Sequence, residues 1–217
     1  CKNQNWLQKI MYSRPEKICF YIMVSDRGIA PNPFHGYCTL ALCTPNHMKA
    51  NLKKGDCIVG CFRSGLPPRV VYIMQIDEIM TFNDYYHDRR FVCKKPSKKS
   101  WITEIGDNIY YMDETGKLRQ DKKTQYHNDV EVKKKDMRGN KVFISKNFVY
   151  FGEKAKTLPD EFTNLLPKTQ GIKYLCCDKP VCDRFIRWAK SKGAGIQGKP
   201  RDKIHANRIC FSRGKSR

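Results

Sequence analysis

The sequence lacks long apolar segments and familiar nucleotide-binding signatures. No run approaches the roughly 18 consecutive apolar residues that cross a bilayer, and no charged start leads into an apolar run with a cleavage site. We therefore expect a cytoplasmic protein that neither spans a membrane nor is secreted. No P-loop, Rossmann fingerprint, His-Glu-x-x-His or Gly-x-Ser-x-Gly string occurs, so common nucleotide hydrolysis and metalloprotease functions lack support. We expect no cofactor.

Acidic residues are scarce as well, with 21 Asp and Glu against 42 Lys and Arg, for a formal net charge of +21. Such an excess repels itself unless a polyanion or counterions compensate it. Most of the excess lies in residues 94–217. A Lys-rich proteome or attraction to anionic lipid would give the same balance, but nucleic acid is the partner we expect, with no membrane partner.

Cysteine, by contrast, is abundant, and its placement argues against a disulfide framework. The 11 cysteines are odd in number, scattered, and mostly embedded in apolar stretches such as "KICFYIMVS" and "GDCIVGC". Cysteine behaves there as a small hydrophobe, so we expect reduced thiols. Near the end of the chain, zinc is an alternative that we do not favour, because the spacing makes a poor tetrahedral site: Cys176, Cys177, Cys182 and Cys210, with His205.

The chain is long enough, and at 40 % apolar residues hydrophobic enough, to form one domain over 1–217. We expect an α+β fold, in which a strongly bent mixed β-sheet or a β-barrel over about 16–152 carries peripheral helices. C-terminal helices and a basic tail would occupy 153–217.

Periodicity and turn signals give the elements. Strands are expected at Lys17–Ser25, Gly36–Cys43, Cys57–Phe62 and Arg69–Met80, with another after Asp107 and two short ones around 145–147. Helices are expected at 46–54, at Pro159–Leu166 and from Asp178 to Gly193, and Thr115–Asn140 is expected to be a long loop.

Three strings carry a family resemblance: "SDRGIAPNPFHGYCTLALCTPNHMKANLKKGDCIVG", "GDNIYY" and "VFISKNFVYFG". They resemble the second of the nucleotide-modification-associated domain families over roughly Ile18–Gly152, with weaker matches toward Gly198–Pro200. The stretch "LKKGDCIVGCFRSGLPPRVVYIMQIDEIMTFNDYYHD" also resembles the core of PUA-like barrels, which include the EVE, ASCH and YTH domains. The resemblance implies a role in systems that modify or recognise altered DNA bases, with a flipped base held in an aromatic pocket.

A pocket that holds an unstacked base needs aromatic faces beside groups that hydrogen-bond a base edge. The loop from Asp26 to Thr39 supplies both, and Pro31 and Pro33 would keep it rigid. Phe34 and Tyr37 would stack on the base. Three polar side chains would read its edge: Asp26, Asn32 and Thr39. Alternatively, the aromatic rings fill the core and Asp26 bonds its own turn.

Further aromatic and basic residues extend this expected interface. Phe62, Arg63 and Tyr110 would line the pocket, and Tyr110 and Tyr111 must point to opposite faces of their strand. The following side chains would contact phosphates: Lys53, Lys54, Arg69, Arg89, Arg90, Lys94, Lys95, Arg184 and Arg187.

The sequence thus predicts a domain that recognises a modified, flipped base in DNA, in a modification or defence context. Other proteins of a modification or restriction system are further expected partners. One alternative is a base-processing enzyme of the glycosylase or hydrolase type, in which Asp26 and Asp107 are the catalytic carboxylates. A basic RNA-binding protein is the other.

Overall fold

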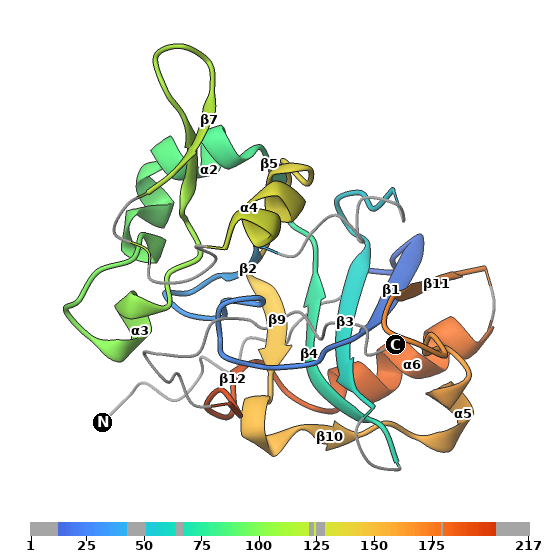
Figure 1. Cartoon of the computed structure of the whole chain (residues 1–217). Helices are drawn as coiled ribbons and strands as arrows, with labels where there is room; N and C mark the ends of the chain where they lie inside the picture. The colour runs from blue at the N-terminus through green and yellow to red at the C-terminus, as the bar shows by residue number, and fades with distance from the viewer. Residues whose placement is uncertain are drawn as a thin grey trace, which may run out of the picture.

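The structure, a computed structural model, describes residues 13–42, 51–63, 67–121, 124, 129–178 and 180–202. Its largest sheet has the strand order β11-β1-β3-β4-β9-β12, and β10 pairs with β4 beside this path (Figure 1). Their bounds are β1 Lys17–Ile22, β3 Cys57–Phe62, β4 Arg69–Gln75, β9 Asn147–Tyr150, β10 Lys156–Thr157, β11 Ile172–Cys176 and β12 Gly195–Ile196.

Two smaller sheets stand beside the large one. The order β2-β8-β5 joins β2 Cys38–Leu40, β8 Val142–Ser145 and β5 Glu78–Met80, and a hairpin joins β6 Tyr110–Met112 to β7 Leu118–Gln120. The helices are α2 Phe82–His87, η1 Arg89–Lys94, α3 Trp101–Glu104, α4 Val130–Met137, η2 Gly152–Lys154, α5 Asp160–Thr163 and α6 Pro180–Lys190. No helix of the described segments combines the length and apolar composition needed to cross a membrane.

The chain bends twice from the large sheet into the sheet β2-β8-β5 or back. One chain segment passes from β4 to β5 at Ile76–Asp77, and another passes from β8 to β9 at Lys146. The Asp77 carboxylate ties the bends together by accepting from the backbone amide of Lys146 and from Asn147 Nδ2 at 2.9 Å. The described strands confirm the expected α+β fold with a multi-stranded mixed sheet, and they do not close into a barrel.

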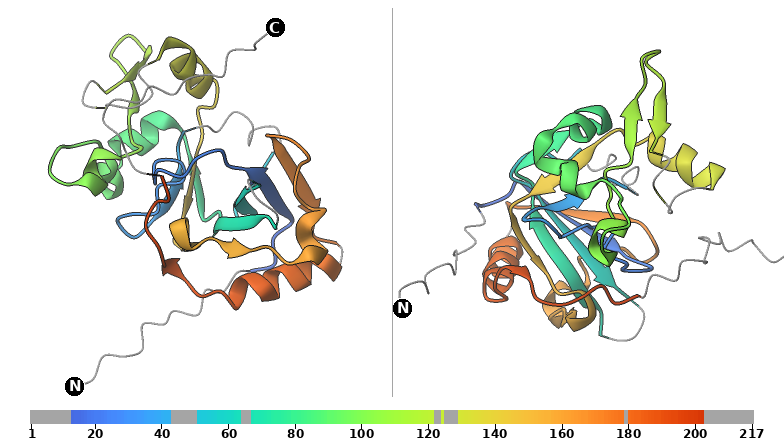
Figure 2. Two further views of the ribbon diagram at one scale, coloured as in Figure 1. Left: turned by 60° about the horizontal axis from the view of Figure 1, so that its bottom comes forward. Right: turned by 90° about the vertical axis from the view of Figure 1, so that its left-hand side faces the viewer.

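Alternation along the strands divides the interior into layers. On one face of the large sheet, residues such as Phe20 and Val59 pack against Phe162 of α5 and Phe185 of α6. On the other face, Tyr72, Tyr150 and their neighbours pack beneath β2. Beyond β2, a third apolar cluster joins the loop that precedes β2 to α2, η1 and α3. Figure 2 shows α6 on the side of the sheet away from α2 and α3.

Several sequence predictions are confirmed, among them the strand Cys57–Phe62, the two short strands on either side of Lys146, and the long helix ending before Gly193. The loop predicted over Thr115–Asn140 is wrong, because it contains β7 and α4. Helix α4 is a polar helix, so its sequence shows no apolar periodicity that would predict it. It starts where the Asp129 side chain accepts from the amides of Glu131 and Val132 at 2.9 and 3.2 Å. The helix expected at 46–54 lies largely outside the described residues.

Candidate functional site

The loop Asp26–Thr39 has a fixed shape in the structure. Backbone bonds between Asn32 and Thr39, at 2.8 and 2.9 Å, close it into a turn whose tip has positive φ at His35 (58°) and Gly36 (78°). The sequence string with its two prolines therefore forms an ordered turn that leads directly into β2.

A buried lysine holds this turn from inside. Lys94, the last residue of η1, is 1 % exposed, and its Nζ lies 2.8 Å from the carbonyl oxygen of Asn32 and 2.8 Å from that of Tyr37. It also contacts Asn32 Oδ1 at 2.9 Å and Thr39 Oγ1 at 3.0 Å. An ammonium has three N–H donors, so these acceptors use all of them. Burial lowers the pKa of Lys94 to about 8.

Asp107 provides the opposite charge for Lys94. Its carboxylate, also 1 % exposed, accepts from Thr39 Oγ1 at 2.6 Å and from the Tyr85 hydroxyl at 2.8 Å. Burial raises the pKa of Asp107, while the nearby Lys94 charge and the two hydroxyl donors lower it. The Thr39 hydroxyl therefore links a buried cation to a buried anion, and the pair joins the loop to α2 and η1.

A second buried carboxylate fixes the start of the loop. Asp26 accepts from the Tyr150 hydroxyl at 2.7 and 2.9 Å, and from the amides of Gly28 and Arg201, both at 3.3 Å. Reciprocal bonds of 2.7 and 2.8 Å between Asp26 and Asp202 add the end of the described chain. Burial raises the pKa of Asp26.

The polar atoms predicted to read a base edge are thus used within the protein. Asn32 Nδ2 donates to the carbonyl oxygen of Ile105 at 2.9 Å while its Oδ1 accepts from Lys94, and Thr39 and Asp26 are bonded as described above. Phe34 is 6 % exposed and belongs to the core. Of the predicted pocket residues in this loop, Tyr37 is the one that stays partly exposed.

Two aromatic side chains reach the surface beside the loop. Tyr37 packs against Phe91 with ring centroids 5.1 Å apart, and Lys146 Nζ lies 5.2 Å from the Tyr37 ring. Trp101, 46 % exposed, meets the Phe34 ring edge-on at 5.4 Å.

Sequence reasoning missed Trp101 and Lys146. The string "KKPSKKSW", in which Lys98 and Lys99 are exposed just before Trp101, is the signal that marks this part of the surface.

The remaining predicted residues fall into separate groups. Phe62 and Tyr110 are buried, and Arg201 covers the Phe62 ring at 3.6 Å. Lys94 was predicted to contact phosphate, which is wrong because it is buried. Some exposed cations pair with acids: Lys53 with Glu16, Arg90 with Glu78 and Asp88, and Arg184 with Glu161. The other exposed basic candidates are Lys54, Arg63, Arg69, Arg89 and Arg187.

These cations do not share one surface. Arg184 and Arg187 lie on α6, which the large sheet separates from the loop, α2 and α3 (Figure 2). Arg63 lines a cleft of about 530 Å³ with residues of α5, and its guanidinium donates to the carbonyl oxygen of Pro167 at 2.6 Å. Three exposed lysines accompany the aromatic residues of this region: Lys146 lies over the Tyr37 ring, and Lys98 and Lys99 precede Trp101 in the chain.

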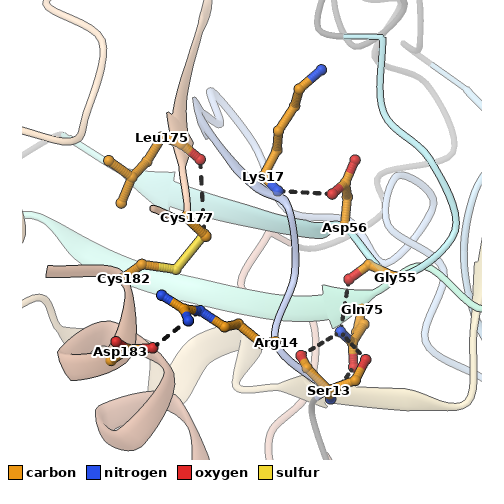
Figure 3. The surroundings of a disulfide bond; sticks show 10 residues. All are labelled: Ser13, Arg14, Lys17, Gly55, Asp56, Gln75, Leu175, Cys177, Cys182 and Asp183. Carbon is orange, nitrogen blue, oxygen red and sulfur yellow. Dashed lines mark hydrogen bonds and ion pairs between the residues drawn. A yellow bond between two sulfur atoms is a disulfide. The ribbon is translucent and has the colours of Figure 1, made fainter. Parts of the chain in front are cut away.

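Two of the cysteines near the end of the chain form a disulfide, which corrects the expectation of reduced thiols for that pair, whereas Cys176 is free. Cys177, just after β11, is bonded to Cys182 in the first turns of α6, with 5.3 Å between their Cα atoms (Figure 3). Arg14 and Asp183 form an ion pair at 3.5 Å beside it. Within the described residues no group of three or more potential metal ligands gathers, and Cys210 and His205 lie outside them.

Comparison with known proteins gives one match. The family model described as nucleotide modification associated domain 2 matches residues 15–207. No curated protein and no solved structure matches the chain.

Proposed function

The chain belongs to the nucleotide modification associated domain 2 family, and on this basis we propose that it is a nucleic-acid-binding domain that recognises a modified base in DNA. The family places the chain in a nucleotide-modification context, and the net charge of +21 suits a polyanionic partner.

The observation that carries the proposal is a rigid loop with exposed aromatic rings and lysines at its edge. Tyr37 and Trp101 present ring surface to solvent, and Lys146, Lys98 and Lys99 are exposed near them. Bases stack on aromatic faces with about 1–3 kcal/mol per base, and lysines attract the flanking phosphates. The buried Lys94 contacts to Asn32, Tyr37 and Thr39, here called the Lys94 clamp, support this role, because a loop that is already rigid loses little conformational entropy when it binds.

His35 is the side chain of the loop that suits reading a base edge. It is exposed at the tip of the turn, and partial loss of hydration there, together with the nearby Lys94 charge, lowers its pKa. A neutral imidazole offers one donor and one acceptor to a base. His35 therefore takes the role that the sequence suggested for Asp26, Asn32 and Thr39.

The enzyme alternative has less support from the geometry. The two carboxylates that would serve as catalysts, Asp26 and Asp107, are each 1 % exposed and accept hydrogen bonds from protein groups on both oxygens. A general base must reach the proton that it removes in a bound substrate. A reader needs no such group, and a search for altered nucleosides distinguishes the two functions.

The test is binding of single-stranded oligonucleotides, followed by fluorescence anisotropy. We expect Trp101→Ala and Tyr37→Ala each to weaken binding about 5- to 100-fold, the equivalent of one lost stacking contact. Tyr174→Ala is the matched control, because Tyr174 is 52 % exposed on β11 and has Lys17 over its ring at 5.8 Å. Equal affinity for wild type and both loop variants would contradict the proposed site.

A further inference from the structure

A second aromatic group lies outside the loop, between α2 and the hairpin β6–β7. The Tyr86 and Tyr111 rings stack with centroids 4.7 Å apart and an interplanar angle of 28°. Lys95 Nζ lies 3.6 Å from the Tyr86 ring centroid. A cation and a stacked ring at these distances cannot occupy the same face, so Tyr86 is held between Lys95 and Tyr111. The Tyr86 hydroxyl also donates to Asp121 at 2.9 Å, which fixes the ring plane.

The stack ends at the molecular surface. Strand β6 alternates, so that Tyr110 is buried, with its hydroxyl bonded to Asp136 at 3.1 Å, whereas Tyr111 is partly exposed. The next residue, Met112, is 42 % exposed. Figure 1 shows the hairpin projecting beyond α2, away from the large sheet. An ordered stack of a lysine and two tyrosines therefore terminates in a ring that solvent reaches.

Basic residues accompany this ring. Arg119 is the cross-strand partner of Tyr111 and is exposed, and Lys117, just before β7, is exposed as well. Asp113 binds Arg119 at 2.6 Å and holds it beside the hairpin. Lys117, together with the Arg119 guanidinium whose charge Asp113 partly offsets, suits a phosphate backbone whose bases are unpaired, because paired bases cannot present their faces to Tyr111.

The stack is also linked to the loop. Tyr85, the neighbour of Tyr86 on α2, packs on Phe91 at 4.7 Å, and Phe91 packs on Tyr37 at 5.1 Å. Lys95 follows the clamp residue Lys94 directly. The segment from α2 to α3 thus supports both aromatic surfaces in one rigid arrangement.

We propose that the Lys95–Tyr86–Tyr111 stack is a second base-stacking site, which binds an unpaired nucleotide of the same strand whose modified base occupies the loop. This inference rests on the proposed function of the loop. It adds that the ligand is an unpaired strand of several nucleotides and that affinity depends on strand length.

The experiment compares a 3-nucleotide and a 12-nucleotide single strand of DNA by fluorescence anisotropy, each carrying the modified base that wild type binds best. We expect Tyr111→Ala to weaken binding of the 12-nucleotide strand about tenfold and to leave the 3-nucleotide strand unchanged. Tyr111→Phe keeps the stacking face and should match wild type. Tyr174→Ala, the exposed tyrosine on β11, should also match it.

A second readout separates stacking from folding. A 2-aminopurine in the 12-nucleotide strand should lose fluorescence on binding to wild type and Tyr111→Phe, and less on binding to Tyr111→Ala. If Tyr111→Ala binds both lengths as wild type does, or loses both equally together with a lower melting temperature, the stack has a structural role and the inference is wrong. If wild type binds neither strand, the proposed function itself fails, and the inference with it.

Discussion

Removing the buried amine of Lys94 should be among the most damaging single changes in this protein. In Lys94→Met the side chain keeps a similar length, but the carbonyl oxygens of Asn32 and Tyr37 lose a buried donor. Each such loss costs about 1–3 kcal/mol. Asp107 would also lose the cation that stabilises its charge in the interior, and breaking a buried charge pair costs about 3–5 kcal/mol. Because these terms overlap, we expect the free energy of unfolding to fall by about 3–5 kcal/mol.

Urea unfolding of wild type, Lys94→Met, Asp107→Asn and the double variant measures this effect. The double variant should be less destabilised than the sum of the single changes by about 1–2 kcal/mol, because it removes both charges. Hydrogen exchange gives a local readout, since the amides of Asn32 and Thr39 close the turn and should lose protection in Lys94→Met. A loss below about 1 kcal/mol, with both amides still protected, would refute the clamp.

The second buried carboxylate, the net charge, the buried thiols and the disulfide can each be tested separately. Asp26→Asn should lower the free energy of unfolding, measured in urea, by about 1–3 kcal/mol, because an amide group would face the donors of Tyr150, Gly28 and Arg201. The same change should leave oligonucleotide affinity nearly unchanged. A selective loss of binding would instead place Asp26 in the binding site. Affinity should fall with salt with a logarithmic slope of about −0.7 to −0.9 per phosphate neutralised, and filter binding that stays flat would remove nucleic acid as the reason for the charge. Stability should fall above pH 9, because burial raises the pKa of Cys19 and Cys38 from 9.0 to about 12, and that of Cys57 and Cys61 further still. Because the unfolded chain loses these thiol protons at a lower pH than the folded protein, the free energy of unfolding should fall by about 1.4 kcal/mol per thiol for each pH unit. Lys94 has the opposite effect for one proton, because burial lowers its pKa in the folded protein. A urea midpoint that stays constant from pH 8 to 10 would contradict the burial of the thiols. Cys182→Ser should cost about 2 kcal/mol, the loop-closure entropy of a short loop, and a thermal melt equal to that of wild type under non-reducing conditions would show that the disulfide adds nothing.

The sequence was sufficient where local chemistry decides the structure. The alternating apolar runs predicted most strands of the bent sheet, and the string "APNPFHG" predicted a rigid turn rather than a strand. The strand predicted after Asp107 also required Tyr110 and Tyr111 to face opposite ways, but the sequence did not show which of the two is buried. That choice depends on Asp136, which is 26 residues away and bonds Tyr110.

What the sequence could not predict depends on contacts between distant segments. Lys94 meets Asn32 across 62 positions, and Asp26 meets Tyr150 across 124, so polar groups that looked free to bind a base are used internally. A lysine in a run of lysines is expected at the surface, and nothing local distinguishes Lys94 from Lys95. Because the buried polar side chains of the loop bond within the protein, the proposed interface consists of His35 and Tyr37 in the loop and Trp101 beside it.

The nucleosides that the protein retains from modified DNA show whether it recognises a modified base. Fragmented, heat-denatured DNA that contains a known fraction of modified cytosine, thymine or adenine is passed over wild-type protein and over Trp101→Ala, and bound and unbound DNA are digested to nucleosides for mass spectrometry. We expect one modified nucleoside to be enriched intact in the DNA bound by wild type, and the enrichment to fall in Trp101→Ala. Equal ratios in bound and unbound DNA, or the appearance of a released or altered base, would contradict it.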